Sequence, residues 1–384
     1  MGPPYGREVT DDLTSELADF RDLARDFLAK EVAPHHDQWE RDGIVPRELW
    51  LRAGAAGLLG INLPAEHGGG GVADYRFNAA LIEEQCRALL TGPGFSLHND
   101  VAAPYFISLG TEEQLARWVP GMTSGELIAA IAMTEPGTGS DLQGIRTTAV
   151  EVEGGWKLNG SKTFITNGIN GDLVITAART GDKLSLMVVE RGMPGFERGR
   201  NLDKIGMHAQ DTAELSFTDV FVPRANLLGE EGKGLTYLMY NLAQERLTIA
   251  NQAVSGAEGA LAATLDYVKE RTAFGKPIGE FQHNAFLLAE LATEVKVARV
   301  FTDWAITEHC KGHLDATTAS MAKLHCTEMQ QRVVDRCVQL HGGYGFMQEY
   351  AIARAWTDAR VQTIYGGTSE IMKLVIARSL GLRS

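Results

Sequence analysis

The chain has 384 residues, of which 44% are hydrophobic and 22% charged, and its 36 basic and 49 acidic residues give a net charge of −13. This is the composition of a globular protein with two or three domains, at roughly 100–200 residues per domain, so wholesale disorder is excluded. The acidity argues against a surface that wraps nucleic acid or an anionic membrane, because both need clustered lysine and arginine.

Cysteine usage and the lack of long apolar runs indicate the compartment. The cysteines are scattered without CxxC spacing, so we expect neither a disulfide framework nor a zinc site, and a reducing compartment fits best. They are Cys86, Cys310, Cys326 and Cys337. No apolar stretch approaches the roughly 18 residues of a membrane span, and Met1–Thr10 has no apolar signal core. We therefore expect a cytoplasmic protein without membrane insertion.

Residues 1–130 form the first predicted domain, and their pattern is helical. Apolar residues recur there at steps of three and four, as in an amphipathic helix. Examples are Leu17, Phe20, Ala24 and Phe27. Thr111 and Gln114 have the spacing of a capping box, which predicts a helix that begins there. The glycine run at 68–71 is interpreted as a surface loop, with a phosphate-binding loop as the alternative.

Residues 131–232 form the second predicted domain, where the hydrophobic period changes to two. Gly154-Gly155 separates two alternating runs, which is typical of a hairpin. Asn159-Gly160, Asn167-Gly168 and Gly181-Asp182 are interpreted as further turns between strands. Because no crossover helix interrupts these strands, we predict a compact antiparallel β domain rather than a parallel α/β sheet.

Residues 233–384 form the third predicted domain, and they are helical again. Long helices with short connections are typical of an antiparallel four-helix bundle. The predicted helices span 235–271, 280–310, 316–340 and 369–380. The fold class is therefore α+β and multi-domain, with an N-terminal α-helical domain, a central antiparallel β domain and a C-terminal helical bundle.

Familiar nucleotide and metal motifs are missing or incomplete. There is no GxGxxG, which disfavours a dinucleotide site of the Rossmann type. His309 and His313 have the spacing of metal ligands on a helix, but no acidic third ligand is obvious. We interpret them as two solvated histidines and expect no metal.

One carboxylate lies within an apolar stripe. At about 100° per residue, Glu245 falls in the middle of the face that a helix over 235–253 should bury. The neighbouring residues of that face are Leu238, Leu242 and Ile249. Burial disfavours the charged form of a carboxyl group and raises its pKa, which suits a general base near neutral pH. A structural ion pair with Arg246 is the alternative.

A glycine turn near the C-terminus leads into a helix. Gly366 and Gly367 precede Thr368, a natural N-cap, and an apolar segment follows. Free N–H groups at such a helix start favour an anion or a polarised oxygen. The alternative is an ordinary helix start.

Five motifs together resemble the acyl-CoA dehydrogenase family, in family order and over about residues 10–380. They are Met133-Thr-Glu-Pro-Gly-Thr-Gly-Ser-Asp141, Gly160-Ser-Lys-Thr-Phe-Ile-Thr-Asn-Gly168, Arg271-Thr-Ala-Phe-Gly-Lys276, Gln339-Leu-His-Gly-Gly-Tyr-Gly345 and Ile364-Tyr-Gly-Gly-Thr-Ser-Glu370. In the medium- and short-chain branches the base is a glutamate at the position of Gly366. Gln244-Glu-Arg-Leu247 is instead similar to the long-chain branch, which makes Glu245 the base.

The resemblance implies FAD as cofactor and assigns residues to it. Those expected around the isoalloxazine ring are Met133, Thr134, Gly139, Ser140, Phe164 and Thr166. Those expected at the pyrophosphate and adenine, partly from a neighbouring subunit, are Arg271, Phe274, Gln282, Gln339 and Gly343. Thr368 and Glu370 should lie near the adenosine end. Ser140 should also meet the thioester substrate, Arg246 the CoA moiety, and the N–H of Gly366 the thioester carbonyl.

The activity implied is the α,β-dehydrogenation of a fatty acyl-CoA to a trans-2-enoyl-CoA. Glu245 would take the α proton while FAD accepts the β hydride, and an electron-transferring flavoprotein would take the electrons. The family also implies a homotetramer. The alternatives are an acyl-CoA oxidase or flavin monooxygenase on the same fold, although oxidases are commonly longer, and a non-catalytic binding homologue.

Overall fold

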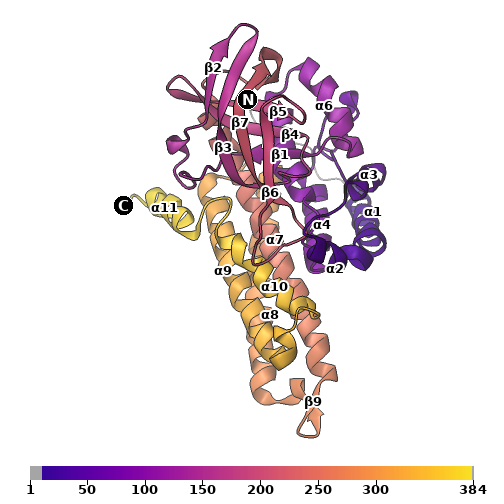
Figure 1. Cartoon of the computed structure of the whole chain (residues 1–384). Helices are drawn as coiled ribbons and strands as arrows, with labels where there is room; N and C mark the ends of the chain where they lie inside the picture. The colour runs from indigo at the N-terminus through magenta and orange to yellow at the C-terminus, as the bar shows by residue number, and fades with distance from the viewer. Residues whose placement is uncertain (1–10, 383–384) are drawn as a thin grey trace.

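The computed structural model describes residues 11–382, so the expectation about Met1–Thr10 lies outside the described residues. The N-terminal part is helical, as predicted (Figure 1). Its helices are α1 (Asp11–Phe27), α2 (Ala33–Asp42), α3 (Arg47–Ala55), α4 (Tyr75–Arg87), α5 (Ala103–Leu109) and α6 (Glu112–Ser124), with π-helical turns η1 (Leu28–Val32) and η3 (Leu97–Ala102). Within the described residues, no helix combines the length and apolar character needed to cross a membrane.

Local signals in this part behave as the sequence predicts. The capping box is present, since the Thr111 hydroxyl accepts from the Gln114 N–H and the Gln114 side chain accepts from the Thr111 N–H. The glycine run is a structural loop: the N–H groups of Gly69, Gly70 and Gly71 all donate to carbonyls of residues 60–64. Amides used in this way cannot also bind a phosphate.

The central part is one sheet. Within residues 11–382 eight strands form it, in the order β6-β7-β3-β2-β4-β5-β8, with β1 beside β4. They are β1 (Ala129–Ala132), β2 (Thr148–Val152), β3 (Gly155–Thr166), β4 (Leu173–Thr180), β5 (Lys183–Glu190), β6 (Phe196–Asn201), β7 (Thr212–Pro223) and β8 (Leu227–Leu228). The predicted hairpins at 154–155 and 181–182 are present.

Two details of the sheet correct the sequence prediction. β1 and β2 each pair with β4 in parallel, so the sheet is mainly rather than purely antiparallel. Asn159-Gly160 is no turn but a β-bulge inside β3, where Gly160 has φ +151° and a Cβ would lie 2.5 Å from the Thr147 hydroxyl. Only glycine fits such a position, so this glycine permits a close backbone approach instead of a chain reversal.

The C-terminal part is an antiparallel helical bundle with one unexpected member. Its helices are α7 (Gly234–Glu270), α8 (Gln282–Cys310), α9 (Ala316–His341), α10 (Ala351–Ala359) and α11 (Ser369–Ser379). The predicted fourth helix, α11, packs on α9 but projects sideways, and the short α10 completes the bundle (Figure 1). A small hairpin of β9 (Thr272–Ala273) and β10 (Lys276–Pro277) forms the far tip of the bundle (Figure 1).

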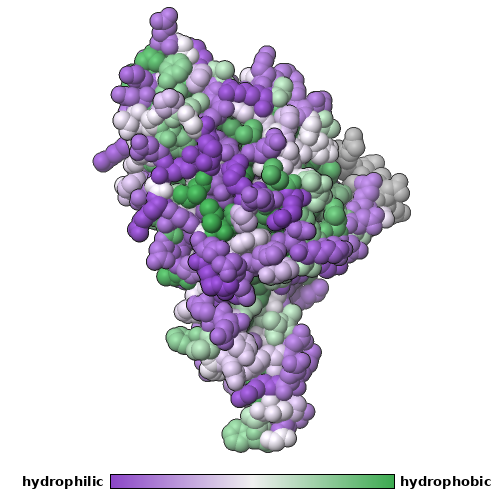
Figure 2. Space-filling model, turned by 45° about the vertical axis from the view of Figure 1, so that its right-hand side comes forward, coloured by the Kyte–Doolittle hydropathy of each residue, from purple (hydrophilic) through white to green (hydrophobic). Residues whose placement is uncertain are grey.

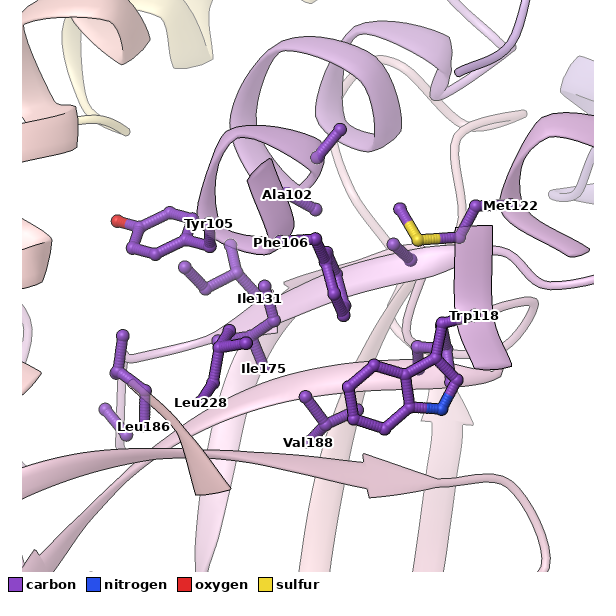
Figure 3. Packing of buried hydrophobic residues seen from close by; sticks show 14 of the residues in the cluster. Ala102, Tyr105, Phe106, Trp118, Met122, Ile131, Ile175, Leu186, Val188 and Leu228 are labelled. Atoms are coloured by element: carbon purple, nitrogen blue, oxygen red, sulfur yellow. The ribbon is translucent and has the colours of Figure 1, made fainter. Parts of the chain in front are cut away.

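The cores explain how these parts hold together. Figure 3 shows side chains of α5 and α6, among them Phe106 and Trp118, packed onto strand residues such as Ile175 and Val188. A separate core fills the bundle between α7, α8, α9 and α10. The division of the chain at 130/131 and 232/233 stays a prediction.

Candidate active site

A cavity of about 540 Å³ lies where the end of the sheet meets the C-terminal helices. Four segments line it, at 134–140, 164–166, 204–212 and 357–368. Seven of the residues expected at the cofactor or substrate are brought together here. They are Thr134, Gly139, Ser140, Phe164, Thr166, Gly366 and Thr368. We call this space the first cavity.

A buried ion pair fixes the loop that begins this lining. Lys162, with an exposed fraction of 0%, donates to Glu135 at 2.9 Å and to the carbonyl of Met133 at 3.0 Å. Burial lowers the pKa of Lys162 to about 8, against the attraction of Glu135. Burial opposes ionisation of Glu135, but hydrogen bonds from Thr147, Arg146 and Lys162 prevail and lower its pKa. Met133 itself is half-buried beside Thr134.

A side chain at either position of the glycine turn at 366–367 would require a strained backbone and the displacement of a neighbouring side chain. Gly366 has φ +62° and Gly367 has φ +94°, both in the left-handed region. A Cβ on Gly366 would lie 2.2 Å from Cδ1 of Ile249. In the described part of the chain, the N–H of Gly366 donates to no protein acceptor. It can therefore meet a ligand oxygen.

Lys323 and Thr368 hold this turn from either side. The Lys323 side chain, 1% exposed, donates from Nζ to the carbonyl of Gly367. Burial lowers the pKa of Lys323 to about 8, and the nearby Arg246 lowers it further. The Thr368 hydroxyl accepts from the N–H of Ile371 and caps α11, as predicted. Glu370 is exposed in the first turn of α11.

Glu245 is buried on α7, with an exposed fraction of 4%. The Tyr105 hydroxyl donates to its Oε1 at 2.9 Å. Burial raises the pKa of Glu245 to about 7, against the opposing effects of Tyr105 and Arg246. Glu245 does not itself line the first cavity, but Ile249, one helical turn further on the same face, packs against Gly366. This face of α7 therefore lies directly behind the cavity wall.

Arg246 lies between α7 and α9 rather than at a cavity. It is 4% exposed, and its Nη1 donates to the Ser320 hydroxyl at 3.1 Å. Its guanidinium lowers the pKa of Glu245 but forms no hydrogen bond with that carboxylate in the described chain. Within the described residues, Glu245 and Arg246 thus form no ion pair, contrary to the structural alternative.

The remaining predicted residues lie near the far tip of the bundle. Arg271, Gln339 and Gly343 line a second cavity of about 590 Å³. Phe274, 96% exposed, lies in the tip hairpin and contacts Phe281, which immediately precedes Gln282. Along α9, the 16 residues from Lys323 to Gln339 span about 24 Å at 1.5 Å per residue. One chain thus presents two separate groups of predicted cofactor residues.

Three functional neighbours escaped the sequence analysis. Tyr105 and Lys323 are polar groups in apolar helical segments, a signal that could have identified them. Asp358 is the third: its carboxylate accepts from the Met207 N–H at 2.5 Å and the Thr91 hydroxyl at 2.6 Å. It thereby fixes the 204–212 wall of the first cavity, and burial raises its pKa to about 6.

One histidine prediction was wrong. His309 is half-buried rather than freely solvated: its Nε2 lies 3.1 Å from Oε1 of Gln244, and burial lowers its pKa to about 4. His313 is exposed beside Glu308, as predicted. The helix end at Cys310 allows His309 to turn inward while His313 falls in the following loop.

The arrangement suits removal of a proton from a carbon acid. A buried carboxyl with a pKa near neutrality can act as a general base. A free backbone N–H at the glycine turn can polarise a carbonyl oxygen. The Gly366 turn lines the first cavity, and Glu245 lies on the face of α7 directly behind its wall.

Comparison with known proteins gives consistent matches over nearly the whole chain. Family models of the acyl-CoA dehydrogenase N-terminal, middle and C-terminal domains match residues 14–126, 130–220 and 232–381. The long-chain specific acyl-CoA dehydrogenase, mitochondrial, of Rattus norvegicus is 50% identical over 98% of this chain and 90% of its own length.

Solved structures agree with these matches. The acyl-CoA dehydrogenase from Geobacillus kaustophilus is similar with a TM-score of 0.93 and 49% identity, covering 98% of this chain and 100% of that one. A glutaryl-CoA dehydrogenase from Mycobacterium smegmatis in complex with FADH2 has a TM-score of 0.90 at 26% identity, over 97% and 95% of the two chains.

Proposed function

The chain belongs to the acyl-CoA dehydrogenase family of FAD-dependent oxidoreductases, and we propose that it dehydrogenates a fatty acyl-CoA thioester to the trans-2-enoyl-CoA. An electron-transferring flavoprotein is the proposed acceptor of the electrons. The observation that carries the proposal is the buried Glu245, with a pKa near 7, on the helix face behind the first cavity. Position 366, where a glutamate base would otherwise lie, is a glycine with φ +62°, and a Cβ there would require the terminal methyl of Ile249 to move.

The walls of the first cavity fit a flavin ring. A Cβ on Gly139 would meet no atom within 4 Å, so the wall is open there. Phe164, at φ +59°, leaves 68% of its surface exposed for stacking on a flat ring. Thr134, Thr166 and Thr368 add hydroxyl groups at the rim. We assign the isoalloxazine to this cavity, with Met133, Gly139, Ser140 and Phe164 around it, and Glu370 near its adenosine side.

The residues of the chain divide the proposed chemistry between them. Bound FAD supplies the acceptor for the hydride from the β carbon. Glu245 takes the α proton, which its raised pKa allows near neutral pH. The N–H of Gly366 receives the thioester oxygen as negative charge develops there. Ser140, which lines the first cavity, would contact the thioester substrate.

The proposed contact of Arg246 with the CoA moiety is indirect in this geometry. Its guanidinium is buried and donates to Ser320. It instead acts on its neighbours through charge: it favours the ionised form of Glu245 and disfavours the charged form of Lys323, because it lowers the pKa of both groups.

The second cavity supports a cofactor site shared between copies. Because Arg271, Gln339 and Gly343 lie about 24 Å from the Gly366 turn along α9, we assign them, with Phe274 and Gln282, to the pyrophosphate and adenine of FAD in a neighbouring copy. Exposed apolar side chains on α8 support a homotetramer. They are Phe286, Val297, Val300 and Trp304. Four free cysteines support a cytoplasmic location.

Replacement of Glu245 by Gln tests the proposal. We expect the variant to keep FAD, because the amide preserves shape, and to lose reduction of the flavin by acyl-CoA by about 10²–10⁴-fold, the contribution of a general base. The measurement is anaerobic bleaching of the flavin by acyl-CoA esters of graded length. Glu370→Gln tests the competing carboxylate, which is exposed in the first turn of α11. Glu48→Gln is the matched control, because that carboxylate is exposed in the first turn of α3, away from the proposed site.

The result that contradicts the proposal is normal bleaching in Glu245→Gln, or loss of bleaching only in Glu370→Gln. Fast peroxide formation when the reduced enzyme meets air would instead identify an oxidase. A purified chain that takes up no FAD would identify a binding homologue.

A further inference from the structure

Tyr105 is fully buried on α5 and reaches across to α7. Figure 3 shows its ring at the edge of the apolar cluster, with the oxygen directed away from the other labelled side chains. That oxygen donates to Oε1 of Glu245 at 2.9 Å. Within residues 11–382 no other hydrogen bond from protein reaches this carboxylate.

The carboxylate fixes the direction of this hydrogen bond, because an ionised carboxylate can only accept. The phenol proton of Tyr105 is therefore directed to Glu245. Asn241 precedes Glu245 by one turn of α7, and it acts to lower the pKa of Tyr105 against the larger effect of burial. Asn241 is itself anchored by a bond from Nδ2 to the carbonyl of Tyr237 at 3.3 Å.

The two helices cannot easily separate around this contact. Gln244, beside Glu245, donates to the carbonyl of Asp100 in η3 at 2.8 Å. Because η3 continues directly into α5, this bond ties the start of α5 to α7. The phenol therefore meets the carboxylate in one orientation rather than by chance contact.

We propose that Tyr105 is a positioning residue for Glu245, whose hydroxyl holds Oε1 and leaves Oε2 to receive the α proton of the substrate. The inference rests on the proposed function, because it assumes that Glu245 is the base. The Tyr105 hydroxyl also has a second effect: it sets the pH range over which Glu245 is ionised and can accept a proton.

The electrostatic argument follows from the groups around Glu245. Burial favours the neutral carboxyl, whereas a donor at 2.9 Å favours the ionised form. Arg246 acts in the same direction as Tyr105. The other titratable groups on helices packed against this stretch are Asp100 and His309, both neutral at pH 7 through burial, Lys323, which lies behind Arg246, and Tyr75 on α4. Loss of the phenol hydroxyl therefore raises the pKa of Glu245.

Tyr105→Phe tests this in the FAD-loaded enzyme. We expect the variant to retain FAD. When the rate of flavin reduction by acyl-CoA is measured against pH, we expect the acid limb of the profile to move to higher pH by about one unit. The rate below the wild-type midpoint then falls about tenfold, since one pH unit is a factor of ten in the ionised fraction. The matched control is Tyr75→Phe. Tyr75 is equally buried, and its hydroxyl contacts Thr248 at 2.8 Å on α7, the helix that carries Glu245.

A second variant keeps the test independent of folding. 3-Fluorotyrosine placed at position 105 has nearly the same shape but a more acidic phenol, which is a stronger donor. We expect it to move the acid limb to lower pH, opposite to phenylalanine. A structural role alone would not produce shifts of opposite sign.

An unchanged acid limb in both Tyr105 variants, or an equal shift in Tyr75→Phe, overturns the inference. These outcomes are distinct from failure of the proposed function, which would appear as a wild-type flavin that no acyl-CoA reduces, or as full activity of Glu245→Gln.

Discussion

Gly366 and Ile249 pack so closely that a larger residue at position 366 would contact the Ile249 side chain. The isoleucine methyl occupies the space that a side chain at 366 would need, and the left-handed φ of +62° adds a cost of about 1–2 kcal/mol for any other residue. The proposed base lies elsewhere, on α7, where Glu245 precedes Ile249 by one turn. The strained backbone at Gly366 and the Ile249 methyl beside it both disfavour a carboxylate at position 366.

This exclusion predicts the outcome of moving the base. In Glu245→Gln combined with Gly366→Glu, we expect no recovery of flavin bleaching, because the new side chain collides with Ile249. Addition of Ile249→Ala removes the obstructing methyl, and we expect part of the activity to return. The measurement is anaerobic flavin reduction in the three backgrounds. Full activity of the double variant would show that Ile249 does not close this position.

At the scale of elements, the first cavity depends on buried polar links between loops and strands. Lys162 on β3 holds Met133 and Glu135 of the loop after β1, and Asp358 at the end of α10 holds Met207. Such groups are costly to bury, but once paired they fix the loops that carry Thr134, Gly139 and Ser140. The cavity walls are therefore held by charge-assisted hydrogen bonds as well as by apolar packing.

Lys162→Met tests the link between β3 and the loop. It leaves Glu135 buried without its ammonium partner, and loss of one partner of a buried pair costs about 3 kcal/mol. We expect a lower free energy of unfolding in urea together with weaker FAD retention. Lys30→Met is the control, because Lys30 pairs with Asp26 at the exposed surface and its loss should leave the midpoint unchanged. Full stability of Lys162→Met would remove the pair from this role.

At the scale of the whole molecule, the two groups of residues that we assign to FAD lie at two separate cavities, one beside the sheet and one near the tip of the bundle. Figure 2 shows exposed hydrophobic residues at the tip of the helical stem, near the hairpin that carries Phe274. The exposed face of α8 runs between the tip and the main body. Under the proposed assembly, a second copy covers this face and its tip meets the first cavity, so that the two groups of residues complete one FAD site.

Val300→Asp tests this assembly. Val300 is 55% exposed in the single chain, so a charge costs little there unless another copy covers it. We expect a smaller species by sedimentation and a loss of bound FAD, because the Arg271 group is withdrawn. Val150→Asp on β2, where Val150 is 61% exposed, should change neither. An unaltered assembly mass, or a smaller species that retains FAD, would contradict a shared site.

Periodicity by itself determined much of this molecule. The 3.6-residue pattern placed Glu245 on the buried face of α7, the two-residue pattern located the sheet, and the turn residues located its hairpins, because these signals depend only on neighbouring residues. The nine-residue α10 was missed because it is shorter than the windows of 11–18 residues in which helical periodicity is read. Asn159-Gly160 was misread because a glycine can serve a bulge as well as a turn.

Tertiary structure alone decided what surrounds the base. Tyr105 and Glu245 are 140 residues apart, and Gly366 and Ile249 are also remote in sequence. No local pattern encodes that a phenol from α5 donates to α7, or that an isoleucine fills the space beside a distant glycine. The sequence supplied the acidic side chain and the face on which it lies. The packing of separate helices removed water from it, raised its pKa and directed its hydrogen bond.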